Sequence, residues 1–274
     1  MNLLGFVRVS EIKQNGEDMI FDTHAHYDDS DFDIDREELL GQMKVAGVSH
    51  IVNIGASLES TKRSLELAQK YDFIYATVGV HPSDTGELNE ETFAWLREQC
   101  KAPKVVAVGE IGLDYYWDEP DRAIQKEWFG RQIALAREAK LPLVIHSRDA
   151  AQDTVDIMKA EKAEEAGGIL HCFSYTKEMA KIFLDMDFSF GIGGVVTFKN
   201  AKKLKEAVEY IPMDKIVIET DCPYLSPEPN RGKRNSSLNL PYVIKAIAEL
   251  KNLSEEEVMK ITYENAKKIY RIMD

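Results

Sequence analysis

Two histidines separated by one residue, His24 and His26, end a short apolar stretch of β-prone residues, IFDTHAHY at positions 20–27. Side chains alternate along a strand, so both imidazoles are expected to project from one face, together with Asp22. Two imidazoles presented side by side can supply half of a metal site, and we expect Asp22 to orient one of them. A pair of structural histidines is the alternative, because a His-x-His motif by itself does not decide between the two.

Four further side chains that can bind a metal lie at or near the ends of predicted strands: Glu110 in the strand 105–114, His146 in 143–148, His171 in 168–173 and Asp221 in 216–221. In a barrel of parallel strands, the carboxyl ends meet at one rim, where active sites are built. His50, unlike the other five histidines, opens its strand, so we expect it at the opposite end in a structural role. The sequence therefore predicts a cluster of six metal ligands at one rim.

Six ligands exceed what a single tetrahedral zinc with an open position requires. They suit two divalent cations about 3.5–4 Å apart, bridged by a carboxylate and a water or hydroxide. Glu110 is the predicted bridge, because a carboxylate can give one oxygen to each metal. Imidazole ligands favour zinc, whereas carboxylates and water also admit manganese or magnesium.

Asp221 is the predicted catalytic carboxylate, with Glu110 as the second catalytic group. An aspartate bound to one metal can accept a proton from the bridging water and so act as general base. Glu219, two residues earlier on the same strand face, is expected to support a ligand or to serve as one occasionally.

Three residues are predicted to contact the substrate. Arg148 follows His146 by two residues and can clamp an anionic oxygen, although an ion pair with a neighbouring Asp is the alternative. His81 ends a strand at the same rim, where it either touches substrate or packs in a turn. Arg231 belongs to a basic loop, residues 223–237, that follows the eighth strand, where barrels often bind phosphate. A solvated loop is the alternative there.

Three consecutive aromatic residues, Tyr115, Tyr116 and Trp117, follow the predicted strand 105–114. Aromatic rings at the rim of a nuclease can stack on bases. Packing in the core or in a lid explains these residues equally well.

Strands and helices alternate along the whole chain, which predicts a parallel sheet. The predicted strands are 20–27, 50–56, 74–80, 105–114, 143–148, 168–173, 188–194 and 216–221. The predicted helices are 35–46, 58–69, 89–98, 121–139, 150–159, 177–185, 201–209, 241–250 and 255–271. Eight such units indicate an α/β protein with a closed (β/α)₈ TIM barrel as a single domain, residues 19–274. A doubly wound open sheet would require a G-x-G-x-x-G turn after the first strand, which is absent. Residues 1–18 are expected to form a leader without an assigned function.

The composition limits the classes of function. Lys and Arg total 34 against 47 Asp and Glu, a formal net charge of −13, which excludes a general, sequence-indifferent nucleic-acid coat. Bound divalent cations reverse the local charge, so a nuclease remains compatible. Three cysteines without paired spacing, Cys100, Cys172 and Cys222, indicate reduced thiols and a cytoplasmic protein. Strand alternation predicts that the last two face away from the rim. No apolar run approaches the length of a membrane span.

Several motifs, in this order and spacing, resemble the TatD family of metal-dependent deoxyribonucleases. They are FDTHAHYDD, GVHP, VGEIGLDYY, LPLVIHSRDA, HCFSYT and IETDCPYLSP, and the similarity extends from about residue 21 to the C-terminal helix. The resemblance implies a TIM barrel with two divalent metals and hydrolysis of phosphodiester bonds in DNA, with the metal positions at His24, His26, Glu110, His146, His171 and Asp221. Family members often have Glu-Pro after R-G-K-x-N, whereas this chain has RGKRNSSLNLP.

The predicted function is therefore a two-metal hydrolase that cleaves a DNA phosphodiester, with action expected at exposed strand ends. The same cage of ligands can activate water for attack on a carbonyl, so an amidohydrolase or deacylase acting on a small anionic amide or ester is the alternative. A metal-stabilised binding protein is a third hypothesis. It requires closed coordination, which six ligands shared by two metals disfavour. No membrane association and no obligate protein partner are expected.

Overall fold

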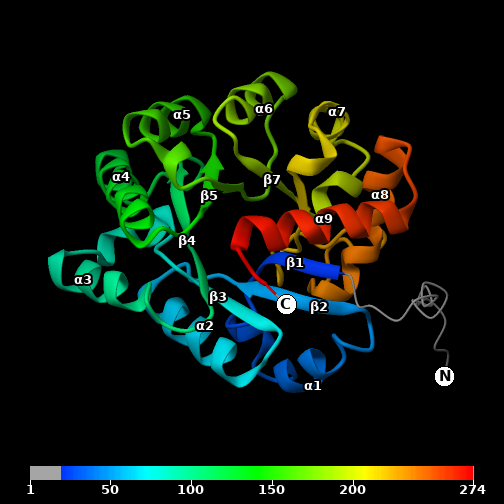
Figure 1. Ribbon diagram of the computed structural model, residues 1–274, viewed down its shortest axis with the longest axis horizontal. Coiled ribbons are helices and arrows are strands. Elements are labelled where there is room, and N and C mark those ends of the chain that lie inside the picture. Colours follow the sequence, from blue (N-terminus) through cyan, green and yellow to red (C-terminus); the bar gives the residue numbers. More distant parts are fainter. Residues whose placement is uncertain (1–19, 274) are drawn as a thin grey trace.

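Eight parallel strands form the centre of the structure, a computed structural model that describes residues 20–273 (Figure 1). The strands are β1 (Ile20–Ala25), β2 (Val48–Asn53), β3 (Ile74–Val78), β4 (Val105–Asp114), β5 (Leu143–Arg148), β6 (Gly168–Leu170), β7 (Ser189–Ile192) and β8 (Ile216–Ile218). Each strand pairs with the next in sequence order. A parallel bridge between Ala25 and Cys222 joins the chain beyond β8 to β1. The predicted (β/α)₈ barrel is thus confirmed.

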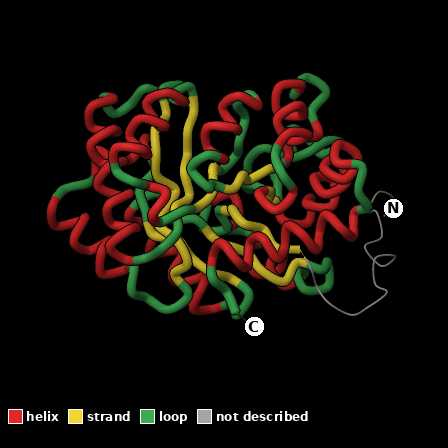
Figure 2. Tube along the Cα trace, turned by 45° about the horizontal axis from the view of Figure 1, so that its top comes forward, coloured by secondary structure: helices red, strands yellow, loops and turns green. Residues whose placement is uncertain are grey.

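Helices surround the strands, as the outer red tubes and inner yellow strands of Figure 2 show. They are α1 (Arg36–Gly41), α2 (Leu58–Lys70), α3 (Glu90–Gln99), α4 (Arg122–Ala139), α5 (Ala151–Ala160), α6 (Lys177–Leu184), α7 (Lys202–Tyr210), α8 (Leu240–Lys251) and α9 (Glu255–Tyr270). Helix α1 is shorter than the predicted 35–46. It ends at a glycine, which disfavours helix, and the amides of Gln42 and Met43 bond carbonyls only three residues back.

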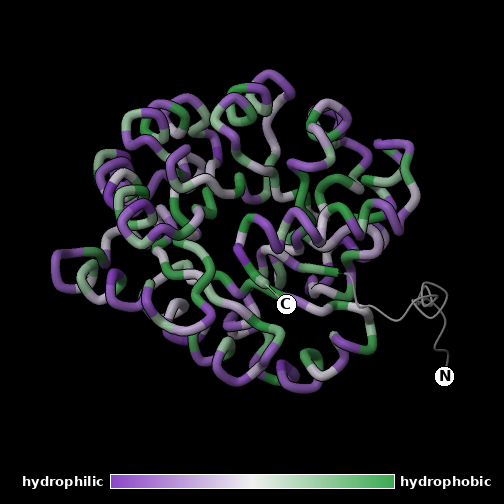
Figure 3. Tube along the Cα trace, in the orientation of Figure 1, coloured by the Kyte–Doolittle hydropathy of each residue, from purple (hydrophilic) through white to green (hydrophobic). Residues whose placement is uncertain are grey.

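Buried apolar residues form clusters within the barrel and between its strands and helices, and green segments of the inner strands are visible in Figure 3. One buried cluster unites Phe21, Val52 and Val144 with residues of other strands and with Tyr270 of α9. Because strands on several sides of the barrel contribute to this cluster, its side chains point inward. The Tyr270 hydroxyl donates a hydrogen bond to the carbonyl of Thr23 over 2.8 Å. Helix α9 therefore packs against the interior of the barrel.

His50 belongs to this end of the barrel. It pairs in register with Phe21, stacks on that ring at 5.0 Å, and contacts Tyr263 of α9 edge to face. The prediction that His50 is separate from the other histidines is confirmed. The leader predicted for residues 1–18 lies outside the described residues. Among the described helices, none combines the length and apolar character that crossing a membrane requires.

Candidate metal centre

The six predicted ligands meet at one end of the barrel, although only three of them lie within regular strands. His24, Glu110 and His146 are part of β1, β4 and β5. The other three, His26, His171 and Asp221, follow the last residues of β1, β6 and β8. The strands thus place three of the ligands at the rim, and the segments just beyond the strands supply the other three.

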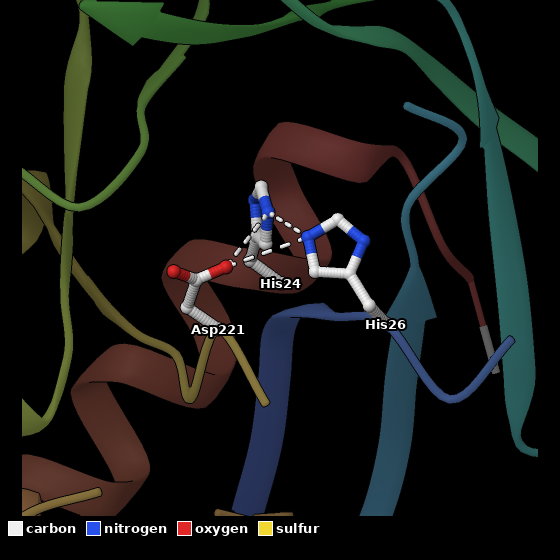
Figure 4. Close-up of side chains that lie close together, drawn as sticks. All are labelled: His24, His26 and Asp221. Carbon is white, nitrogen blue, oxygen red and sulfur yellow. Dashed lines mark hydrogen bonds and ion pairs between the residues drawn. The ribbon is translucent and has the colours of Figure 1, made fainter. Parts of the chain in front are cut away.

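Three ligands of the first group, His24, His26 and Asp221, come from opposite ends of the chain and lie together, as Figure 4 shows. Nε2 of His24 and Nε2 of His26 lie 3.1 Å apart, and both face Oδ1 of Asp221, at 3.7 and 3.4 Å. Oε2 of Glu110 lies 3.5 and 3.7 Å from the same two nitrogens. Four potential ligand atoms therefore surround one point.

The second group surrounds the other oxygen of Glu110. Its Oε1 lies 2.8 Å from Nδ1 of His146, 3.6 Å from Nε2 of His171 and 3.8 Å from Nε2 of His81. Asp221 also approaches this group, with Oδ1 3.8 Å from Nε2 of His171. The two oxygens of one buried carboxylate thus face two different sets of imidazoles.

These distances fit bound cations. In a tetrahedron with bonds of about 2.1 Å, neighbouring ligands lie about 3.4 Å apart. The first group spans 3.1 to 3.7 Å. A divalent cation between the atoms would also relieve the close approach of the His24 and His26 nitrogens. The first group therefore has the donor set and the spacing that a divalent metal requires, and Glu110, His146 and His171 of the second group could also hold a metal.

Both carboxylates of the centre are ionised. Burial raises the pKa of Glu110, but the charge of His171 and hydrogen bonds from His146 and His24 outweigh it, and the pKa lies well below its usual value. Burial likewise raises the pKa of Asp221, and His171, His26 and His24 bring it below normal. Negative charge is thus available to balance a bound cation.

The pKa values of the histidines are shifted in opposite directions. Burial lowers the pKa of His24, and burial together with the charge of His146 lowers that of His81 to about 4. Burial also opposes the charged form of His26, but Asp221 and Glu110 raise its pKa to about 9. The low pKa of His81 makes this side chain neutral near pH 7, able to donate or accept a hydrogen bond.

Asp114 is a site residue that the sequence analysis missed. Its Oδ2 lies 3.2 Å from Nε2 of His146, whose Nδ1 faces Glu110. Its Oδ1 accepts hydrogen bonds from the amides of Tyr116 and Trp117, at 2.9 and 3.1 Å. Asp114 thus fixes the imidazole with Nδ1 toward the centre. The even spacing from Glu110 along one strand was a signal for this role.

Glu219 supports His171, as predicted. Its Oε1 lies 3.0 Å from Nδ1 of His171 and accepts a 2.6 Å hydrogen bond from the amide of Cys172. The second oxygen, Oε2, is buried without a hydrogen-bond partner. Gly191 of β7 provides the space, because a Cβ atom there would lie 2.0 Å from Oε2.

We therefore expect Gly191→Ala to push the Glu219 carboxylate away from His171. Glu219 is fully buried, so the added methyl group overpacks the site and costs about 1–3 kcal/mol of unfolding free energy. Urea unfolding of the variant measures this loss. Gly41→Ala, at a position with no neighbouring atom within 4 Å of the added carbon, is the matched control and should not be destabilised. Equal stability of Gly191→Ala and wild type would contradict the packing argument.

Asp22 does not orient an imidazole, contrary to the prediction. Its carboxylate accepts hydrogen bonds from the Thr220 amide at 3.0 Å, the Thr220 hydroxyl at 2.7 Å and the Ser237 hydroxyl at 2.6 Å. It also accepts a 3.3 Å bond from the backbone amide of His24. Asp22 thus joins β1 to the chain after β8, and burial raises its pKa to about 7. Ser237 lies in the segment that departs from the usual Glu-Pro.

Cys172 lines the cleft instead of facing away from it, so that prediction is wrong. Strand β6 ends at Leu170, and Cys172 has a φ angle of 45°, so strand alternation does not extend to it. Asp221 has a similar φ of 56°, a conformation that Asp tolerates better than most residues. Cys222 is fully buried, away from the cleft.

A cleft of about 790 Å³ opens above the centre, and two of the three predicted substrate contacts line it, Arg148 and His81. Arg148 is exposed and stacks on Tyr116, with 3.8 Å between the guanidinium carbon and the ring centre. Arg231 does not belong to the lining and lies 4.2 Å from the ring centre of Phe198. Its contact with substrate stays a prediction. The neighbouring Arg234 forms a bidentate ion pair with Asp35.

Comparisons with known proteins agree with this architecture. The sequence profile of TatD related DNases matches residues 21–271. An uncharacterized metal-dependent hydrolase, YabD of Bacillus subtilis, is 50% identical over 93% of this chain and 100% of its own length. The 3'-5' ssDNA/RNA exonuclease TatD of Rahnella is 31% identical, over 92% of this chain and 98% of its own. The crystal structure of YJJV, a TatD homologue from Escherichia coli, superposes with a TM-score of 0.88 at 28% identity, covering 93% of this chain and 99% of that one. This chain therefore belongs to the TatD family of metal-dependent hydrolases.

Proposed function

We propose that this protein is a deoxyribonuclease that uses two divalent cations to hydrolyse phosphodiester bonds at exposed DNA ends. The observation that carries the proposal is the orientation of Glu110, whose two oxygens face separate groups of imidazoles. His24, His26 and Asp221 would hold one cation and His146 and His171 the other, with Glu110 shared between them. A relative named as an exonuclease on single-stranded DNA and RNA supports the substrate class.

Each residue of the cleft has a role in this reaction. Bound divalent cations supply polarisation of a phosphoryl oxygen and a lowered pKa for water. Asp221, ionised in the centre, accepts the proton of the attacking water through its carboxylate. Arg148 binds a phosphate oxygen of the scissile group. Within residues 20–273 it forms no ion pair, so its guanidinium is available. Neutral His81 donates or accepts a hydrogen bond at the substrate.

Two further carboxylates act through the histidines. Asp114 and Glu219 hold the outer nitrogens of His146 and His171, so the inner nitrogens keep their lone pairs directed at the centre. Arg231, beyond the cleft lining, is proposed to meet the phosphates of the strand outside the active site. All three cysteines are free thiols, which supports a reducing compartment, and we propose the cytoplasm.

Metal removal tests the proposal. Protein treated with a chelator is expected to release no nucleotides from end-labelled single-stranded DNA, and to regain activity when Zn²⁺, Mn²⁺ or Mg²⁺ is added. Elemental analysis of the active form should give two cations per chain. DNA left intact by the metal-loaded protein, with hydrolysis of a small anionic carboxyl ester instead, would overturn the nuclease in favour of the deacylase alternative.

A further inference from the structure

Two large aromatic side chains stand exposed at the mouth of the cleft. Trp117 is 65% exposed and Tyr224 is 53% exposed, and both line the cleft above the metal centre. Trp117 follows β4 and Tyr224 follows β8, which are four positions apart in the ring of eight strands. The two rings therefore stand on opposite sides of the mouth.

Neither ring is buried in the core. Tyr115, by contrast, packs against the core, hydrogen-bonds Asp153 at 2.5 Å and lies beneath the guanidinium of Arg122. Trp117 makes a T-shaped contact with Tyr116 at 5.1 Å, and most of its surface stays exposed. Of the aromatic residues that were predicted to stack on bases, Tyr115 is therefore structural, whereas Trp117 is accessible to a ligand.

The backbones that carry the two rings are tied to the catalytic centre. The amide of Trp117 donates to Asp114, the carboxylate that holds His146. The amide of Tyr224 donates to the carbonyl of Asp221 over 2.9 Å, and its hydroxyl donates to Asp29 over 2.8 Å. The backbone positions that carry both rings are therefore fixed relative to Asp114 and Asp221 before a substrate arrives.

The cleft lining carries few positive charges, so contacts other than ion pairs must contribute to its affinity for DNA. The two exposed rings can supply such contacts. The lining contains six carboxylates, one arginine and no lysine: Asp28, Asp29, Asp84, Glu110, Asp114, Asp221 and Arg148. Affinity for nucleic acid usually rests on several Lys and Arg contacts to phosphates. Stacking of bases on aromatic rings needs no positive charge and is independent of base identity.

We propose that Trp117 and Tyr224 bind unpaired nucleobases on either side of the scissile phosphate, which selects single-stranded DNA ends. The inference rests on the proposed nuclease function and specifies its substrate. In a duplex both faces of an internal base are covered by its neighbours, so only an unpaired strand can present bases to the two rings. Selection of single strands then follows from the rings and not from basic residues.

Kinetics of ring-removing variants test the proposal. For Trp117→Ala and Tyr224→Ala, KM on single-stranded DNA is expected to rise by between about fivefold and 150-fold, the equivalent of one lost stacking contact. The ring-preserving variants Trp117→Phe and Tyr224→Phe should stay within about threefold of wild type. On an oligomer of abasic deoxyribose phosphates, a phosphodiester without any aromatic ring, all four variants should match wild type, because the metal centre is intact.

A second experiment alters the substrate instead of the protein, so its result does not depend on whether a variant folds. DNA with abasic sites at its last two positions should bind wild type as weakly as normal DNA binds the Ala variants. Tyr210→Ala, which removes an exposed ring at the end of α7, is the control for loss of an exposed aromatic. Unchanged KM in both ring-removing variants, or equal KM for abasic and normal DNA, would overturn the inference.

Fluorescence gives a readout that does not require hydrolysis. A phosphorothioate oligothymidylate should quench the tryptophan emission of the metal-loaded wild type, and its abasic counterpart should not. Trp117→Phe should abolish the quenching, because Trp128 is buried and only Trp117 lines the cleft among the three tryptophans. Quenching that persists in Trp117→Phe refutes base stacking on this ring. Wild type that binds the oligothymidylate but hydrolyses neither phosphodiester would instead refute the nuclease function.

Discussion

Replacing Asp221 by Asn is expected to lower the rate of DNA hydrolysis by a factor of about 10² to 10⁴. The carboxylate lies 3.4 Å from Nε2 of His26 and 3.7 Å from Nε2 of His24, and it is ionised in the native centre. An amide of the same size keeps the packing but cannot accept the proton of the attacking water. Nucleotide release from end-labelled single-stranded DNA, at saturating metal, measures the effect.

Asp187→Asn is the matched control for this variant. Asp187 has a φ of 63°, close to the 56° of Asp221, but it is exposed before β7 and pairs with Lys215. The same substitution in the same backbone conformation should leave the rate unchanged there. An Asp221→Asn protein that keeps two cations and wild-type activity would show that another group accepts the proton.

Glu110→Gln is expected to affect both of the proposed metal positions at once. One oxygen of Glu110 faces His24 and His26, and the other faces His146 and His171. The amide removes the shared negative charge and presents an NH₂ group to one set of imidazoles. We expect bound metal to fall from two cations to at most one per chain. Activity should fall at least about a hundredfold, because several kcal/mol of charge stabilisation are lost.

Elemental analysis and titration calorimetry with Zn²⁺ or Mn²⁺ measure this loss directly. Glu165→Gln removes a surface carboxylate that pairs with Arg137 and should leave the metal content at two. His50→Gln, which alters the histidine beside Phe21 and Tyr263, should likewise bind two cations. Full occupancy of both positions in Glu110→Gln would exclude a shared carboxylate.

The sequence was sufficient to predict the barrel and its candidate ligands. Alternation of apolar runs with amphipathic helices is a local property, and it leads to one closed parallel sheet. Placement of polar residues at the ends of buried strands is also local, so the sequence alone assigns His24, Glu110 and His146 to one rim. The separation of His50 followed from the same argument.

Only the tertiary structure decided how the residues outside regular strands point and which partners reach a strand residue from distant parts of the chain. Alternation predicted the wrong direction for Cys172, because its backbone leaves the extended region beyond β6. It also assigned Asp22 to an imidazole, whereas the folded chain brings Thr220 and Ser237, about two hundred residues away, to that carboxylate.

The sequence by itself thus determined the fold, the candidate ligands and the family resemblance, because each depends on periodicity and on motifs that are contiguous in the chain. The tertiary structure alone showed that the two oxygens of Glu110 face different imidazoles. It alone also showed that Asp114 contacts both His146 and the backbone amide of Trp117. It also showed that Trp117 and Tyr224 line one cleft. These relations depend on side-chain direction and on contacts between distant segments, which no local pattern encodes.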